Sequence, residues 1–245
     1  MDRERLMKAI DARRSRRKYI NTPMDSGVVK TLEELVKKYN AMGNVRMELV
    51  TNDGTAFNGL SKSYGLLSGV NDFIGLIADK KDFLMEEKLG YYGEILVLEA
   101  TALGLGTCWV GGSFDKKNMP FALSDNENVA CTITIGSVDE KDSFKEKLVR
   151  SLSHRKTKTV EELYTGDPIV PEWFINGMQA VQKAPSAVNR QPVLFSYDAG
   201  VVTASVKDET DFMMAIDLGI AKLHFELGAG SGSWEWGNGS RFVLG

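Results

Sequence analysis

The sequence is poor in the residues that build disulfide-linked or metal-dependent scaffolds. Its 245 residues include two cysteines, Cys108 and Cys131, and two histidines, His154 and His224. None of them stands in a CxxC pair or another metal-ligand spacing, so the sequence predicts no structural disulfide and no metal site. A content of 43% hydrophobic residues is enough for a sizeable core without either. We therefore expect the chain to fold in a reducing compartment.

Charge of one sign and long hydrophobic runs are also lacking. The formal net charge of -3 disfavours a general electrostatic attraction to nucleic acid or to anionic membranes. No apolar run approaches the roughly 20 residues that span a bilayer. The charged start, from Asp2 to Arg5, lacks the apolar centre of a signal peptide. We expect a cytoplasmic protein that binds neither nucleic acid nor membrane.

Hydrophobic periodicity predicts both helices and strands, which together indicate an α+β fold. The helix that begins near Phe83 is apolar nearly all round in its later part, which is typical of a helix at the centre of a structure. Helices are predicted at 2–14, 26–43, 83–105, 143–155, 173–182 and from 211, and strands at 45–50, 73–78, 108–110, 129–135, 193–197 and 201–206.

The pattern of elements begins again near Val160. Leu227-Gly228-Ala229-Gly230-Ser231 before Trp234 parallels Leu103-Gly104-Leu105-Gly106-Thr107 before Trp109, with one residue inserted. This indicates a degenerate duplication, with a first half at 1–159 and a shorter second half at 160–245 packed together as one unit. The glycine- and serine-rich stretch from Gly54 to Gly69 is expected to be a surface loop, with a lid as one interpretation.

The densest positive charge lies in Arg13-Arg14-Ser15-Arg16-Arg17-Lys18, at the predicted end of the first helix. Guanidinium groups beside a hydroxyl suit the binding of a phosphate. Taken alone, such a run is more often a solvated helix end, since basic runs are common.

Two further segments offer groups for a flat ligand. In Ala184–Pro192, two prolines bound a short loop in which Ser186, Asn189 and Gln191 can present hydroxyl and amide groups. In Gly104–Gly112, glycines allow close approach of the backbone to a ligand. An ordinary connection between helix and strand accounts for either segment. Neither is a GxGxxG or P-loop motif, which excludes a Rossmann-type nucleotide site.

Taken together, RRSRRKY, APSAVNRQP and GLGTCWVGG resemble the nitroreductase family of FMN-dependent oxidoreductases, whose motifs are RRSxRxF-like, APSxxNxQP and GLGTxW. The order differs, because APSxxNxQP precedes GLGTxW in ordinary members, whereas here Tyr39–Asn44 stands in that place. Family members are typically homodimers with flavin sites at the interface. This chain resembles two subunits fused, as in the subgroup of single-chain pseudo-dimers, which implies one FMN per chain and a protein able to act as a monomer.

The resemblance also implies a nitroreductase-like fold, with a central mixed or antiparallel sheet flanked by helices, and it implies roles for individual residues. Arg17 would reach the flavin N1 and C2 carbonyl edge, where a fixed cation favours the reduced flavin, and it is the residue nearest to a catalytic role. Arg13, Arg14 and Ser15 would hold the phosphate, with Arg155 and Lys156 added to that pocket. The ring and ribityl side would be met by Pro185, Ser186, Asn189, Trp109, Val110, Gly111 and Gly112.

The expected activity is electron transfer from NAD(P)H to a nitroaromatic, a quinone or a similar small acceptor. Another flavin reaction on the same scaffold, such as dehalogenation or oxidation, stays open, because family membership does not determine the substrate. A non-catalytic flavin-binding sensor or carrier also stays open. The residues do not distinguish NADH from NADPH.

Overall fold

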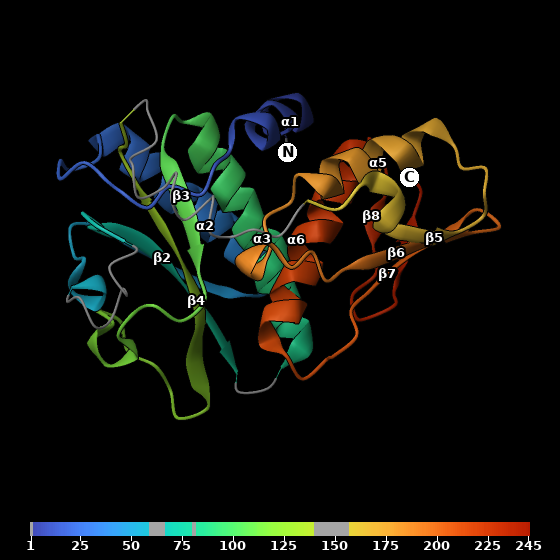
Figure 1. Cartoon of the computed structure of the whole chain (residues 1–245). Coiled ribbons are helices and arrows are strands. Elements are labelled where there is room, and N and C mark those ends of the chain that lie inside the picture. Colours follow the sequence, from blue (N-terminus) through green and yellow to red (C-terminus); the bar gives the residue numbers. More distant parts are fainter. Residues whose placement is uncertain (1, 59–66, 80–81, 140–156) are drawn as a thin grey trace. The chain divides into compact units, whose positions relative to one another are not determined.

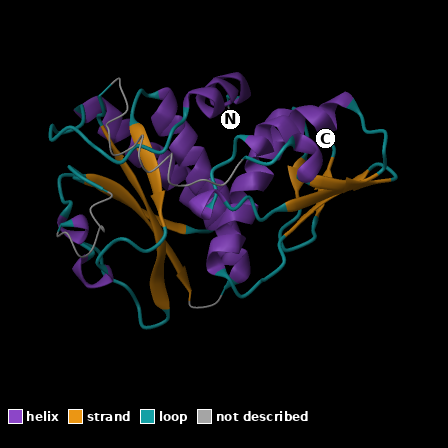
Figure 2. Cartoon of the chain, viewed as in Figure 1, coloured by secondary structure: helices purple, strands orange, loops and turns teal. Residues whose placement is uncertain are grey.

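The structure is a computed structural model that describes residues 2–58, 67–79, 82–139 and 157–245. The chain forms two compact units. Unit 1 consists of Met1–Asp11, Lys81–Ile95 and Arg155–Gly245, and unit 2 consists of Ala12–Lys80 and Leu96–His154. Each unit has helices and its own β-sheet, which confirms the α+β class (Figures 1 and 2).

Unit 2 is built on an antiparallel sheet in the order β1-β2-β4-β3. Strand β2 (Asp72–Asp79) lies inside the sheet and is buried over nearly its whole length, as its continuous apolar sequence predicts. Helix α2 (Ser26–Gly43) is capped by Asp25, whose side chain accepts from the backbone N–H groups of Gly27 and Val28. The other elements are β1 (Arg46–Val50), β3 (Gly106–Val110), β4 (Glu127–Gly136), η1 (Thr55–Phe57), η2 (Lys116–Asn118) and the later part of α3 (Phe83–Ala102).

Unit 1 has a mixed sheet in the order β5-β6-β7-β9-β8, in which only the β5–β6 pair is parallel. Its core is aromatic and centres on Phe225 of α6 (Phe212–Ala229), whose ring lies 5.1 Å from that of Phe242 and 5.3 Å from that of Phe195. The remaining elements are α1 (Arg3–Ala12), α5 (Glu172–Gln182), η3 (Val160–Glu162), η4 (Ala187–Asn189), β5 (Tyr164–Gly166), β6 (Leu194–Asp198), β7 (Val201–Ser205), β8 (Ser233–Trp234) and β9 (Arg241–Val243).

Most predicted elements lie within a few residues of their predicted positions. Helix α3 ends at Ala102 because Gly104 adopts a left-handed φ of +83°, which ends the helical path. The short strands β5, β8 and β9 were not predicted, since two or three residues give no clear alternation. The predicted helix at 143–155 and much of the Gly54–Gly69 loop lie outside the described residues. The duplicated halves and the internal pseudo-dimer stay predictions.

A buried ion pair anchors unit 1. The Nζ of Lys222 in α6 donates to Glu87 of α3 and, at 2.7 to 3.2 Å, to Ser240 Oγ and to the carbonyls of Gly237 and Glu235. Both charged side chains are fully buried. The other oxygen of Glu87 accepts from the N–H of Gly237 at 2.8 Å. This network joins α6, the first part of α3 and the segment between β8 and β9.

Replacing Lys222 by methionine should destabilise unit 1 strongly, because Glu87 would keep a buried charge without its cation. Loss of one partner of a buried pair costs about 3 to 5 kcal/mol, measurable by urea unfolding. The control is Lys8→Met in the exposed pair with Glu4, whose side chains are 76% and 82% exposed, and it should change the unfolding midpoint very little. Equal losses in both variants would contradict the anchoring role of Lys222.

Candidate functional site

The basic segment that follows α1 is held extended against unit 2. Ser15 forms a parallel bridge with Thr107 of β3, where the N–H of Arg16 donates to the Thr107 carbonyl at 2.8 Å. Lys18 forms a second bridge with Ser68, whose backbone bonds both Arg17 and Tyr19 at 2.9 Å. The RRSRRKY and GLGTCWVGG segments, more than 80 residues apart in sequence, are therefore side by side.

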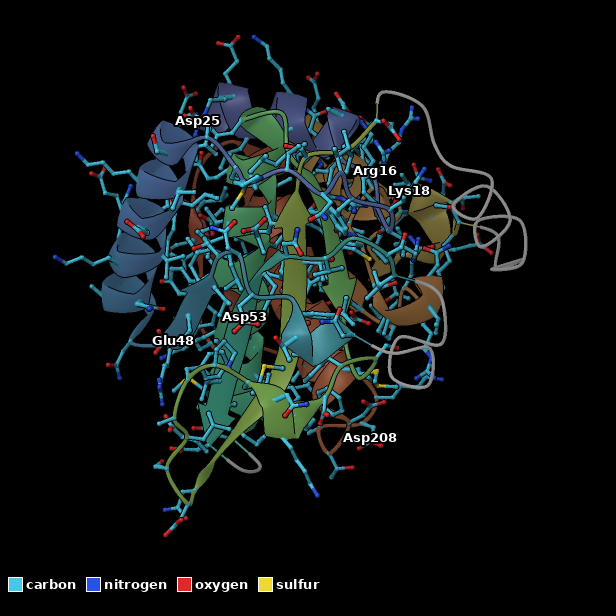
Figure 3. All side chains as sticks on the ribbon, turned by 90° about the vertical axis from the view of Figure 1, so that its left-hand side faces the viewer. Arg16, Lys18, Asp25, Glu48, Asp53 and Asp208 are labelled. Carbon is cyan, nitrogen blue, oxygen red and sulfur yellow. The ribbon has the colours of Figure 1, made fainter. Side chains whose placement is uncertain are left out.

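The basic side chains of this segment differ in their contacts. Arg16 donates to the backbone carbonyl of Asp139 at 2.8 Å, and the Nζ of Lys18 lies 3.9 Å from the Asp139 carboxylate. Figure 3 labels Arg16 and Lys18 on this segment. Arg17 has a contact within the segment itself, since its Nη1 donates to the backbone carbonyl of Ser15 at 3.4 Å.

Arg13 has a buried donor suited to an anion. Its side chain is half-buried, and its Nε has no hydrogen-bond partner among the residues that the structure describes. A buried guanidinium N–H without an acceptor is costly unless a ligand supplies one. A phosphate oxygen would satisfy this group. The basic segment therefore suits the phosphate of FMN both by its composition and by the buried Nε of Arg13.

The β3 end of unit 2 has an apolar inner side and an open turn. The side chain of Val110 is 6% exposed and packs in the core of unit 2 with Phe73 and Phe114. Trp109 is half-buried, and a side chain added at Gly112 would meet no atom of the described residues within 4 Å. The backbone at Gly112 thus leaves room for a ligand, while the Val110 side chain contributes mainly to packing.

The Ala184–Pro192 loop of unit 1 has an unusual backbone. Val188, Asn189 and Gln191 have φ values of +45°, +53° and +45°, in the left-handed region that non-glycine residues rarely adopt. Val188 is β-branched and yet 66% exposed, so neither sterics nor burial explains its position. Strain of this kind persists only where surrounding contacts impose it, and it occurs often at ligand sites.

Internal hydrogen bonds close this loop. The N–H of Gln191 donates to Ser186 Oγ at 2.9 Å, and the Gln191 side chain, 6% exposed, accepts from the N–H of Lys158 at 2.9 Å. The Lys158 ammonium donates to the Gln191 carbonyl at 2.8 Å. Gln191 therefore has a structural role, where its composition had suggested a ligand contact. The Ser186 hydroxyl retains its own proton for donation.

A buried carboxylate that the sequence-based analysis did not single out supports the same loop. Asp217 of α6 is 5% exposed and accepts the N–H of Ala187 at 3.1 and 3.2 Å with its two oxygens. Burial raises its pKa to about 7, although the Ala187 N–H opposes the shift. Asp217 and Ser186 line a cavity of about 20 Å³, room for one water molecule. The available signal was an acid inside an otherwise apolar helical run.

The predicted site residues thus fall into two groups. Unit 2 holds Arg13, Arg14, Ser15, Arg17 and Trp109–Gly112, and the structure pairs Ser15 of the basic segment with Thr107 of β3. Unit 1 holds Pro185, Ser186 and Asn189 in one loop. Arg155 and Lys156 lie outside the described residues. Within the described ranges, no three His, Cys, Asp or Glu side chains are grouped to hold a metal ion, and no helix is long and apolar enough to cross a membrane.

A family model and a solved structure each match nearly the whole chain. The model of the family described as "Putative TM nitroreductase" matches residues 5–229. The crystal structure of a "putative nitroreductase" from Thermotoga maritima is similar, with a TM-score of 0.66 and 23% identity over 98% of this chain and 92% of that one. At this identity the likeness shows the fold. The nitroreductase-like fold predicted from the three motifs is thereby confirmed.

Two further solved structures match part of the chain. An FMN-dependent nitroreductase from Clostridium difficile R20291 is 19% identical and covers 62% of this chain and 99% of its own, with a TM-score of 0.43. A "putative nitroreductase" from Desulfovibrio desulfuricans in complex with FMN is 19% identical, covering 58% of this chain and 94% of its own, with a TM-score of 0.42. Likenesses this weak carry no argument. No curated protein matches the sequence.

The strain at Val188 can be tested by removing its side chain. Val188→Gly should raise the free energy of unfolding, because a left-handed φ costs a β-branched residue about 1 to 2 kcal/mol that glycine avoids. The larger backbone entropy of glycine in the unfolded chain offsets roughly half of this gain. The control is Val201→Gly, at an exposed strand position with ordinary φ, which should destabilise. Destabilisation of both variants by similar amounts in urea would contradict the strain.

Two buried carboxyls should make stability depend on pH. Burial raises the pKa of Asp217 and, with help from Asp82 and Asp211, that of Glu86 to about 7. Because these folded-state values exceed the unfolded value of about 4, stability is fully present below pH 4 and is lost as pH rises through 7. Asp217→Asn and Glu86→Gln should each remove part of that loss, on the order of 1 to 3 kcal/mol. Urea unfolding from pH 4 to 8.5 measures it; unchanged slopes in both variants would refute it.

Proposed function

Because the chain belongs to the nitroreductase family, whose model matches residues 5–229, we propose that it is an FMN-dependent oxidoreductase of the cytoplasm. It takes electrons from NADH or NADPH and passes them to a small acceptor such as a nitroaromatic or a quinone. The observation that supports this most directly is the buried Arg13 Nε, for which the described residues provide no acceptor, in a basic segment that lies beside β3.

The proposed phosphate side is formed by Arg13, Arg14 and Ser15, with Arg155 and Lys156 carried over from the motif resemblance. The extended backbone of this segment, bonded to Thr107 and Ser68, would hold the side chains in place before a ligand arrives. A guanidinium that is already positioned loses little conformational freedom on binding, which favours tight binding of a phosphate.

The proposed ring side consists of Pro185, Ser186 and Asn189, together with the backbone of the Trp109–Gly112 turn. When bound, FMN supplies the electron-transfer chemistry itself. The residues of the chain bind and orient it, and Arg17 supplies a fixed positive charge. A cation near the edge of the ring that gains negative charge on reduction makes reduction more favourable, so Arg17 is the proposed catalytic residue.

One FMN per chain is proposed, because Tyr39–Asn44, the segment that stands where ordinary family members carry the APSxxNxQP loop, has another role. Asn40 lies near the end of α2, where its amide nitrogen donates to the Met47 carbonyl at 2.8 Å and its oxygen accepts the Met47 N–H at 2.9 Å. Both functional groups of Asn40 are used to attach β1 to this helix. The first half therefore lacks the equivalent of Asn189, and an internal pseudo-dimer would have one competent site in a monomeric chain.

Flavin content is the first measurement. The purified protein should be yellow and release about one FMN per chain on heating, and it should oxidise NADH or NADPH in the presence of a quinone or nitroaromatic. Two tightly bound flavins per chain would contradict the single site. Bound FMN without turnover with either nicotinamide would indicate a flavin carrier instead of an enzyme.

Single substitutions then test the assigned roles. Arg13→Ala should weaken FMN binding about ten- to a hundred-fold, the effect of losing a charge-assisted contact worth roughly 1.5 to 3 kcal/mol. Asn189→Ala should weaken it less, since neutral hydrogen bonds are lost. Arg17→Ala should also lower the reduction potential of bound FMN.

The matched control is Arg16→Ala, which removes a guanidinium from the same segment but from the side that contacts Asp139. It should bind FMN nearly as the parent does. Each apo-variant is titrated with FMN after circular dichroism confirms folding. Parent-like affinity of Asn189→Ala together with weak binding by Arg13→Ala would mean that the unit 1 loop does not belong to the site.

A further inference from the structure

The Ser186–Asn189 loop needs a contact from outside itself to keep its shape. Two of its residues, Val188 and Asn189, have left-handed φ values. The Val188 side chain is exposed, so its burial does not offset the cost of this backbone conformation. A strained loop persists only if neighbouring groups impose its conformation. Asp217 is well placed for this, since both of its carboxylate oxygens face the N–H of Ala187, at the start of the strained turn.

We propose that Asp217 is a positioning residue of the flavin site, whose carboxylate holds the Ser186–Asn189 loop in its FMN-binding conformation by accepting the Ala187 N–H. This inference rests on the proposed function, because it assigns a cause to the shape of the proposed binding loop. Asp217 itself lies beneath the loop, on α6, and acts through the backbone of Ala187.

The surroundings of Asp217 make this contact sensitive to protonation. The charged groups that face it are Asp211, which caps the same helix, and Arg190, whose Nη1 lies 3.8 Å from an Asp211 oxygen. The ammonium of Lys158 donates a hydrogen bond to the Gln191 carbonyl. The rest of the cavity lining is apolar apart from Ser186 and Gln191. Burial raises the pKa of Asp217 to about 7, so the carboxylate is present above neutral pH and is lost below it.

Loss of the charge should loosen the loop. A carboxylate accepts a hydrogen bond about twice as strongly as a neutral oxygen, and a protonated Asp217 would also need an acceptor for its own O–H. FMN binding should therefore be stronger above pH 7 than below it. Asp217→Asn keeps the shape and one acceptor oxygen but never carries the charge, so it represents the weakly held loop at every pH.

The experiment compares dissociation constants for FMN in the parent and in Asp217→Asn between pH 5.5 and 8.5. The FMN phosphate titrates near pH 6, but this affects both proteins and cancels in the ratio of the two constants. The variant should bind about three- to ten-fold more weakly at pH 8.5, and the ratio should approach one at pH 5.5. Glu86→Gln removes another buried carboxyl whose pKa is raised to about 7, in α3 and not in the helix that supports the loop. The ratio of its dissociation constant to that of the parent should stay near one at every pH.

A second variant tests the route through Ala187. Ala187→Pro deletes the donor N–H, and the preceding Ser186 has φ and ψ of -145° and 159°, a conformation compatible with a following proline. In this background Asp217→Asn should have little further effect on FMN affinity, because both changes remove one contact.

The outcomes separate this inference from the proposed function. If the parent binds FMN but the Asp217→Asn ratio is one at every pH, or if the two substitutions are additive, Asp217 does not position the loop and only this inference is overturned. If the parent binds no FMN, the proposed function fails and this inference fails with it.

Discussion

The ion pair between Lys222 and Glu87 is the constraint on which unit 1 depends. A fully buried ammonium is tolerated only when its donors all find acceptors, and Lys222 finds them on α3 and on the turn between β8 and β9. These contacts determine where α6 lies against its neighbours. The same helix carries Asp217, about one and a half helical turns from Lys222, so the contacts of Lys222 also help to position the Ser186–Asn189 loop.

In unit 2, backbone hydrogen bonds position the basic segment. The basic segment after α1 has no regular secondary structure of its own, but bridges to Thr107 and Ser68 hold it extended. Asp139 engages Arg16 and Lys18 on one side. The cations of this run are therefore not equivalent: some are bonded to the protein, whereas Arg13 keeps a buried Nε for which the described residues offer no acceptor.

The basic segment of unit 2 and the Ser186–Asn189 loop of unit 1 are both hydrogen-bonded to their surroundings, and each also has a feature that costs free energy in the folded chain. In unit 2 that feature is a buried donor, and in unit 1 it is a left-handed turn with an exposed valine. Folding alone gains nothing from either, because an unpaired buried N–H and a strained φ both cost free energy. A phosphate bound at Arg13 and a polar ring edge bound at the left-handed turn would offset these costs, as the proposed flavin cofactor would do.

The sequence by itself determined the α+β class, most element positions and the family, because hydrophobic periodicity and three long motifs are local properties of the chain. It could not distinguish Arg13 from Arg16, or recognise Gln191 as structural, since composition does not say which groups the fold will satisfy internally. It also gave no sign of the partner of Asp217. Those distinctions required the tertiary structure, because a buried donor, a strained φ and a raised pKa arise only when residues far apart in sequence are packed together.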